Sequence, residues 1–94
     1  MKLEWSAVAL ADLDRFAIFL QDRHPRMAEI VAHEILAKAR ILETSPELGY
    51  PLGDDGRYRQ IVLEVLQAKY VFRYRIAADR LVMMRVFHGR ERRS

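Results

Sequence analysis

Residues 70–76 read Tyr-Val-Phe-Arg-Tyr-Arg-Ile, and this stretch decides the class of fold. Its side chains at 70, 72, 74 and 76 alternate with Val71, Arg73 and Arg75, which is typical of a strand with one buried face. The same period of two runs through residues 61–65 and 81–86, where positions 82, 84 and 86 alternate with 81, 83 and 85. Short connections at 66–69 and 77–80 force neighbouring strands to run antiparallel, so we expect a three-stranded meander.

The sequence before this meander has the period of amphipathic helices. Ser6 is a typical N-cap residue, and the apolar stripe behind it predicts a helix over about 7–22. A second stripe predicts a helix over about 25–44, which Pro25 begins and Ser45-Pro46 ends. The two stripes consist of Ala9, Leu13, Phe16 and Leu20, and of Ala28, Val31, Ile35, Ala39 and Leu42. The short gap between them predicts an antiparallel helical hairpin.

These elements predict one α+β domain over residues 1–94, with the order β-α-α-β-β-β. A short strand at residues 3–5 begins the domain, and a loop at 46–57 with several prolines and glycines leads into the meander. The hairpin is expected to pack on one face of a small antiparallel sheet, because each layer has one apolar side to bury. Arg73 and Arg75 then point away from the helices, toward an open cationic face.

Composition excludes several classes of protein. The chain has 94 residues, of which 51% are hydrophobic, so we expect a globular domain. It contains no cysteine, which excludes disulfide scaffolds, thiol catalysis and Cys-ligated metal sites. No apolar run approaches the roughly 20 residues that span a bilayer, and no export signal is recognisable. We therefore expect a cytoplasmic protein without a membrane partner.

Charge is distributed unevenly along the chain. Residues 1–56 contain 6 Lys or Arg and 10 Asp or Glu. Residues 57–94 contain 10 Lys or Arg and 3 Asp or Glu. Nine of the ten cations in the second part are arginines, which bind carboxylates and phosphates through a planar fork of donors. A basic half favours an anionic partner, either a nucleic acid, a phosphate or an acidic polypeptide. A solvated surface without a partner is the alternative.

Candidates for catalysis or metal binding are few. His24, His33 and His88 have no second ligand at a spacing typical of a metal site, so we expect no metal and no cofactor. His88 ends the last strand and could act as a general acid or base on RNA, although a packing or capping role is more common there. Residues 53–56, Gly-Asp-Asp-Gly, lack the Lys-Ser/Thr of a phosphate loop and indicate a turn.

Motifs over nearly the whole chain resemble the ParE branch of the RelE/ParE toxin superfamily. They are Glu4-Trp5-Ser6, Ala9-x-x-Asp12-Leu13, a second helix with Pro25 and Ala28, Leu42-x-x-x-Pro46-x-x-Gly49, residues 70–76, and Arg85-Val86-Phe87-His88-Gly89-Arg90. The resemblance implies the bacterial toxin of a type II toxin–antitoxin pair. It also implies a hetero-oligomer with a ParD-like antitoxin that has an acidic, amphipathic C-terminal segment. ParE-type toxins are associated with inhibition of DNA gyrase, whereas RelE-type toxins cut messenger RNA on the ribosome.

This sequence departs from the pattern of the RelE-type nucleases. Val71 stands where they carry arginine, and Val62 and Glu64 stand where lysines are expected. No tyrosine follows Arg90. Because the missing groups would stabilise the phosphate and transfer protons, the departures favour a gyrase-binding toxin with no catalytic residue. Ribosome-dependent cleavage of messenger RNA is the alternative.

The expected contact residues come from the basic half. For partner binding they are Arg59, Arg73, Arg75, Arg85, Arg90, Arg92 and Arg93. For the alternative nuclease, the catalytic set is Arg73, Arg75, Arg85, His88 and Arg90.

Overall fold

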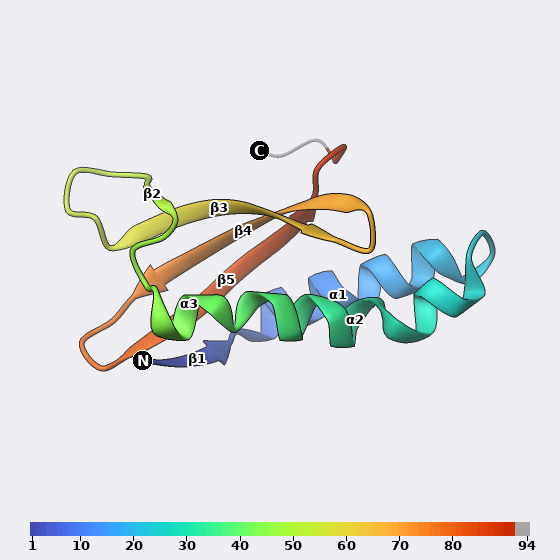
Figure 1. Cartoon of the computed structure of the whole chain (residues 1–94), viewed down its shortest axis with the longest axis horizontal. Coiled ribbons are helices and arrows are strands. Elements are labelled where there is room, and N and C mark those ends of the chain that lie inside the picture. Colours follow the sequence, from blue (N-terminus) through green and yellow to red (C-terminus); the bar gives the residue numbers. More distant parts are fainter. Residues whose placement is uncertain (92–94) are drawn as a thin grey trace.

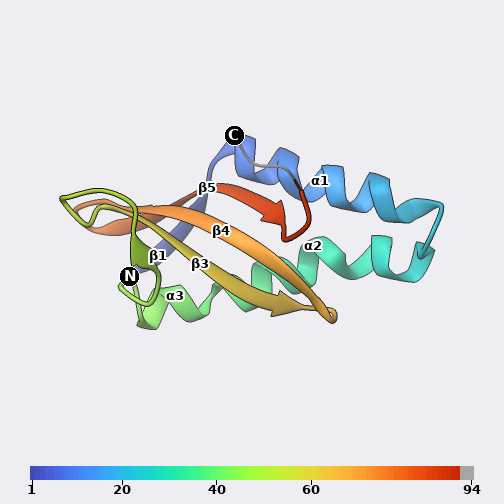
Figure 2. The same ribbon diagram turned by 90° about the horizontal axis from the view of Figure 1, so that it is seen from above.

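The strand β4 (Ala68–Ile76) is the centre of a five-stranded sheet with the order β1-β5-β4-β3-β2. The computed structural model describes residues 1–91. The other elements are β1 (Lys2–Trp5), α1 (Ala7–Gln21), α2 (Pro25–Ala39), α3 (Ile41–Thr44), β2 (Tyr50–Pro51), β3 (Tyr58–Val65) and β5 (Arg80–His88). The hairpin of α1 and α2 lies under one face of the sheet, and none of the helices within residues 1–91 covers the other face (Figure 1). The free end of the hairpin extends beyond the sheet, as the view from above also shows (Figure 2).

The expected α+β class is confirmed, and the structure differs from the expected arrangement in its details. β1 pairs with β5 in parallel, so the sheet is mixed and not purely antiparallel. The reason is that the whole helical hairpin and three further strands separate β1 from β5, which leaves the chain free to return in the same direction. The two-residue strand β2 adds a partner for β3 at Arg59 and Gln60.

Hydrogen bonds explain where the helices begin and end. Ser6 caps α1 as expected, because its Oγ accepts from the backbone N–H of Ala9 at 3.0 Å. The second helix is shorter than expected, since it stops before Arg40 and α3 follows as a separate turn. In α3, Glu43 faces β1 and accepts from the backbone N–H of Leu3 at 2.9 Å. No helix within residues 1–91 has the length and apolar character needed to cross a bilayer.

The core lies between the hairpin and the sheet. Tyr70, Phe72 and Tyr74 of β4 belong to it, together with the expected helix residues Leu13, Phe16, Val31 and Ile35. Arg73 and Arg75 alternate with these aromatic residues, and Arg73 lies opposite Gln60 on β3 and Arg85 on β5. The expectation that Arg73 and Arg75 point away from the helices is therefore confirmed.

A β-bulge changes the alternation along β5. Arg85 pairs with Arg73, whereas Met83 pairs with the next residue, Tyr74, so Met84 is an extra residue. The core positions of β5 are consequently 81 and 83 before the bulge and 86 after it. The expectation that 82, 84 and 86 share one face was wrong, because one inserted residue exchanges the two faces of a strand.

The connection between β3 and β4 is tighter than expected. Only Leu66 and Gln67 lie between the two strands, with φ angles of 51° and 66°. Two consecutive left-handed residues are typical of a two-residue hairpin turn, in which Asn-Gly is the usual pair. The absence of that pair from the sequence explains why a four-residue turn was expected.

Candidate functional site

The open face is the side of the sheet that points away from α1 and α2. Residues opposite one another on neighbouring strands share a face, so Gln60, Arg73 and Arg85 lie side by side across β3, β4 and β5. The register gives this face Tyr50, Tyr58, Gln60, Val62, Glu64, Lys69, Val71, Arg73, Arg75, Val82, Arg85 and Phe87. Tyrosine and arginine are enriched at protein interfaces, and the open face holds both.

Arg73 is held in place by a chain of hydrogen bonds through uncharged side chains. Its Nε donates to Oε1 of Gln60 at 2.6 Å, and Nε2 of Gln60 donates to the hydroxyl of Tyr50 at 2.5 Å. The guanidinium carbon of Arg73 also lies 5.1 Å from the ring centroid of Phe87. These contacts orient the arginine without neutralising its charge.

Arg85 starts on the open face and turns around the edge of the sheet toward α1. Its Nε and Nη2 donate to the two carboxylate oxygens of Asp12, at 2.9 and 3.1 Å. The guanidinium group of Arg85 also packs on the ring of Phe87, whose centroid is 4.6 Å from the guanidinium carbon. The charge of Arg85 is therefore paired within the protein, unlike that of Arg73.

Side chains satisfy the part of the β5 edge that β1 does not cover. β1 pairs only with residues 80–83, which leaves residues 84–88 without a neighbouring strand on the side opposite β4. The N–H groups of Val86 and His88 donate to carboxylates, those of Asp12 at 2.8 Å and Glu91 at 2.7 Å. The carbonyls of residues 84 and 86 accept from side chains of Ser6 and Arg15. We call Ser6, Asp12, Arg15 and Glu91 the β5 edge cluster.

The β5 edge cluster favours the ionised forms of its two carboxylates, those of Asp12 and Glu91. Burial by itself raises the pKa of Asp12, but hydrogen bonds from Arg85, Arg15 and a backbone N–H outweigh burial and hold this pKa below its usual value. Burial likewise opposes ionisation of Glu91, and its bonds from Arg15 and a backbone N–H lower its pKa. The hydrogen bond to Glu91 raises the pKa of Arg15, and the bond to Asp12 raises that of Arg85.

We expect acid to weaken the fold through this cluster. Because the pKa values of Asp12 and Glu91 are lowered in the folded state, their contribution to stability is complete above the unfolded carboxyl values of about 4. It is lost as the pH falls through the lower folded-state values. Urea unfolding at a series of pH values should show this decline, and Glu91→Gln should make it shallower. Glu29→Gln, on the surface of α2, is the control and should leave the decline of the unfolding free energy with pH unchanged. The same unchanged decline in Glu91→Gln would contradict the role assigned to Glu91.

Arg59 is occupied by the loop that precedes β3. It donates from Nε to the carbonyl of Gly56 at 3.0 Å and from Nη1 to that of Gly49 at 2.7 Å. A third bond reaches the carbonyl of Glu47 at 3.2 Å. In the register Arg59 lies opposite Tyr74, on the side of the core, so the structure does not bring it onto the open face with Arg73.

The remaining expected residues lie in several places. Arg75 is half-buried on the open face, opposite Tyr58. His88 lies on the helix side, 5.2 Å from the ring of Tyr70, and its Nδ1 accepts from the backbone N–H of Arg90 at 3.1 Å. Arg90 itself is exposed in the turn after β5. The alternative catalytic set is therefore not gathered on one face, and Arg92 and Arg93 lie outside the described residues.

Sequence reasoning missed the acidic partner of Arg85. Asp12 is only 1% exposed, and it falls three residues after Ala9 and four before Phe16. That spacing places it beside the apolar stripe of α1, so a buried carboxylate was indicated by the pattern itself. Tyr50 and Gln60 gave no such signal, because a loop tyrosine and a strand glutamine meet only through the pairing of β2 with β3.

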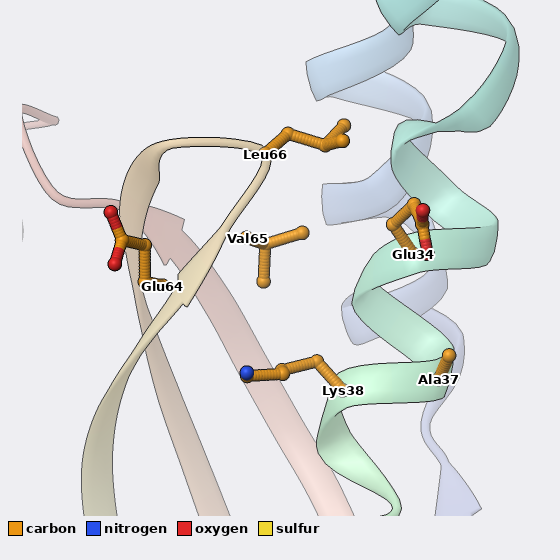
Figure 3. A pocket seen from close by; sticks show the side chains of 6 residues that line it. All are labelled: Glu34, Ala37, Lys38, Glu64, Val65 and Leu66. Atoms are coloured by element: carbon orange, nitrogen blue, oxygen red, sulfur yellow. The ribbon is translucent and has the colours of Figure 1, made fainter.

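A shallow pocket lies between α2 and the outer edge of β3, away from the open face (Figure 3). Val65, Leu66 and Lys38 point into the space between the two elements, whereas Glu64 points away from it. β2 covers β3 only at residues 59 and 60, so at the pocket the outer side of β3, away from β4, has no neighbouring strand within residues 1–91. The pocket is therefore a feature of the sheet edge and separate from the arginines.

The comparisons with known proteins agree with this architecture. The family model that matches, over residues 3–93, is described as the ParE toxin of the type II toxin–antitoxin system, parDE. The chain belongs to the ParE toxin family. The RelE/ParE resemblance inferred from the sequence motifs is thereby confirmed.

Relatives of this ParE-family toxin include one curated protein and several solved structures. Toxin RelE1 of Caulobacter vibrioides is 31% identical over 88 residues, which cover 94% of this chain and 92% of that protein. A structure titled as the chromosomal ParDE system of P. aeruginosa superposes with a TM-score of 0.74 at 19% identity, covering 94% and 95% of the two chains. A YoeB/ParE toxin from Agrobacterium tumefaciens superposes with a TM-score of 0.52 at 23% identity, covering 95% of this chain and 99% of that chain. These two structures support the shared fold.

Proposed function

We propose that this ParE-family toxin inhibits DNA gyrase by binding to it in the bacterial cytoplasm, without catalysing a reaction. The observation that carries the proposal is the open face, where Arg73 and Arg75 lie among exposed tyrosines. Such a face suits recognition of a protein surface, since arginine and tyrosine contribute most to hot spots. His88, the histidine of the alternative catalytic set, is turned to the opposite side of the sheet.

We also propose that a ParD-like antitoxin neutralises the toxin in a hetero-oligomer. The family is defined by toxin–antitoxin systems, which supports an antitoxin as partner. An acidic, amphipathic antitoxin segment would complement both the cations of the open face and the apolar side chains exposed on the hairpin, such as Ile18 and Phe19. The two contacts would involve different surfaces of the toxin.

A supercoiling assay with purified gyrase tests the first proposal. The wild-type toxin should inhibit supercoiling, and Arg75→Glu should require about tenfold more toxin, because it reverses one charge at the interface. Arg26→Glu makes the same change on the exposed surface of α2 and should act like the wild type. Both variants should keep the melting temperature, because Arg26 is exposed and half-buried Arg75 makes no side-chain hydrogen bond or ion pair within residues 1–91. Growth arrest in cells without any effect on gyrase would refute the proposal.

Cleavage of messenger RNA is the second candidate, because the similar curated protein bears the name Toxin RelE1. Primer extension on transcripts after induction of the toxin separates the two candidates. Cuts at codon spacing would support a nuclease, and intact transcripts in growth-arrested cells would exclude it.

A further inference from the structure

We infer that Tyr50, Gln60 and Arg73 form a carboxylate-binding site for an acidic side chain of a protein partner. The inference deepens the proposed function and rests on it in one respect, namely that the toxin acts by binding proteins. It is carried by the contacts of these three side chains on the open face and by the charges that surround them.

Gln60 positions the arginine without cancelling its charge. Its side chain is 7% exposed, and both its polar atoms are used, the oxygen by Arg73 and the nitrogen by Tyr50. Arg73 is bound through Nε alone within residues 1–91, so its two Nη groups remain for a ligand. A fork of two guanidinium donors matches the two oxygens of a carboxylate.

Arg85 differs from Arg73 in the charge of its hydrogen-bond partner. Arg85 has Asp12 as its partner, and the pair contains one full charge of each sign. Both arginines pack against the ring of Phe87, so their aromatic contact is alike. Of these two arginines, Arg85 has a carboxylate partner and Arg73 has an amide partner. The charge of Arg73 is therefore the one that stays unpaired.

Tyr50 supplies a second donor to the same site. Its hydroxyl oxygen accepts from Gln60, so its own proton is directed elsewhere, and the residue is 55% exposed. A hydroxyl that already accepts one hydrogen bond still donates one. Packing on Phe87 and bonding to Gln60 fix the arginine before any partner arrives, which lowers the entropic cost of binding.

The surroundings favour a protein carboxylate over a nucleic acid. Besides Arg73, the open face has Arg75, Lys69, which lies opposite the acidic Glu64, and Arg85, whose charge is paired with Asp12. Nucleic-acid binding draws its affinity from many phosphate contacts, and this face offers few cations for them. Exposed Tyr58 and Val62 border the site and suit an apolar protein surface around a central charged contact.

A titration followed by NMR tests the site directly. The signals to observe are the side-chain amide of Gln60 and the Nε–H of Arg73 in the full chain. The probes are a short acetylated and amidated peptide with a Glu-Ala-Glu segment, the same peptide with both glutamates changed to glutamine, and an oligothymidylate. The glutamate peptide should shift both signals saturably and bind about tenfold more tightly than the glutamine peptide, as expected for charge-assisted bonds.

Gln60→Glu is the decisive variant. The new carboxylate would bind both Nε of Arg73 and the hydroxyl proton of Tyr50, which occupies both donors and cancels the charge. We expect peptide affinity to fall about tenfold or more, while the melting temperature is kept. Gln67→Glu, the same change in the exposed β3–β4 turn, is the matched control and should bind like the wild type. Tyr50→Phe removes the hydroxyl donor together with its bond from Gln60, and it should weaken binding even if Gln60→Glu fails to fold.

Three results would overturn the inference. They are equal binding of the two peptides, unchanged affinity in both Gln60→Glu and Tyr50→Phe, and tighter binding of oligothymidylate than of the glutamate peptide. The titration does not use gyrase. A toxin that binds the glutamate peptide without inhibiting gyrase therefore refutes only the proposed function. A toxin that inhibits gyrase without binding the peptide refutes only this site.

Discussion

Replacing Asp12 by alanine is expected to lower the free energy of unfolding by about 2–4 kcal/mol, because a buried carboxylate that accepts several hydrogen bonds is removed. The carboxylate is buried and accepts from Arg85, from Arg15 at 2.5 Å and from the backbone N–H of Val86. Its loss leaves that N–H without an acceptor at the edge of β5. Arg85 also loses its counter-charge, whereas Arg15 keeps its ion pair with Glu91. Both guanidinium groups are about 40% exposed and regain part of their hydration.

Urea unfolding at neutral pH measures this effect. Asp14→Ala on the exposed side of the same helix is the control and should change stability by no more than about 0.5 kcal/mol. Asp12→Asn keeps the shape but removes the charge, so it should fall between the wild type and Asp12→Ala. A cost below about 1 kcal/mol for Asp12→Ala would mean that the edge cluster contributes no more than an exposed ion pair.

Removing the hydroxyl of Tyr74 is expected to cost about 2–3 kcal/mol, because a buried donor and a partly buried acceptor both lose their partner. The hydroxyl donates to the carbonyl of Pro46 at 2.6 Å and accepts from the backbone N–H of Gly49 at 2.9 Å. Tyr74 and Gly49 are buried, so water does not replace the bond to the N–H of Gly49 without a local opening. Tyr74→Phe should therefore loosen the segment that leads into β2.

Two measurements check this second expectation. The free energy of unfolding of Tyr74→Phe is compared with that of Tyr58→Phe, whose hydroxyl lies on an exposed residue and whose loss should cost little. Limited proteolysis should cut residues 46–56 faster in Tyr74→Phe than in the wild type. Equal stability of the two variants would show that the hydroxyl does not anchor the loop.

The close packing at this anchor also explains Gly49. A Cβ on this residue would lie 2.8 Å from the hydroxyl of Tyr74 and 2.9 Å from the backbone oxygen of Gln60. The glycine therefore lets the loop approach the sheet closely enough for its N–H to reach the tyrosine. The same approach brings Tyr50, the next residue, beside Gln60 on the open face.

The periodicity of the sequence was sufficient to predict the helical hairpin, the three long strands and the face to which Arg73 and Arg75 belong. It could not reveal the bulge at Met84, because the insertion is visible only when β5 is aligned with its partner strand. It also failed for β2, which is two residues long and too short to show alternation.

The sequence by itself determined the class of fold, the order of the main elements and the cationic character of one sheet face, because these depend on patterns within a few consecutive residues. Only the tertiary structure decided which arginines keep an unpaired charge. Asp12 meets Arg85 across 73 positions of the chain, and Gln60 meets Arg73 across 13. Such meetings depend on the packing of separate elements, and local patterns contain no information about the partner that packing supplies.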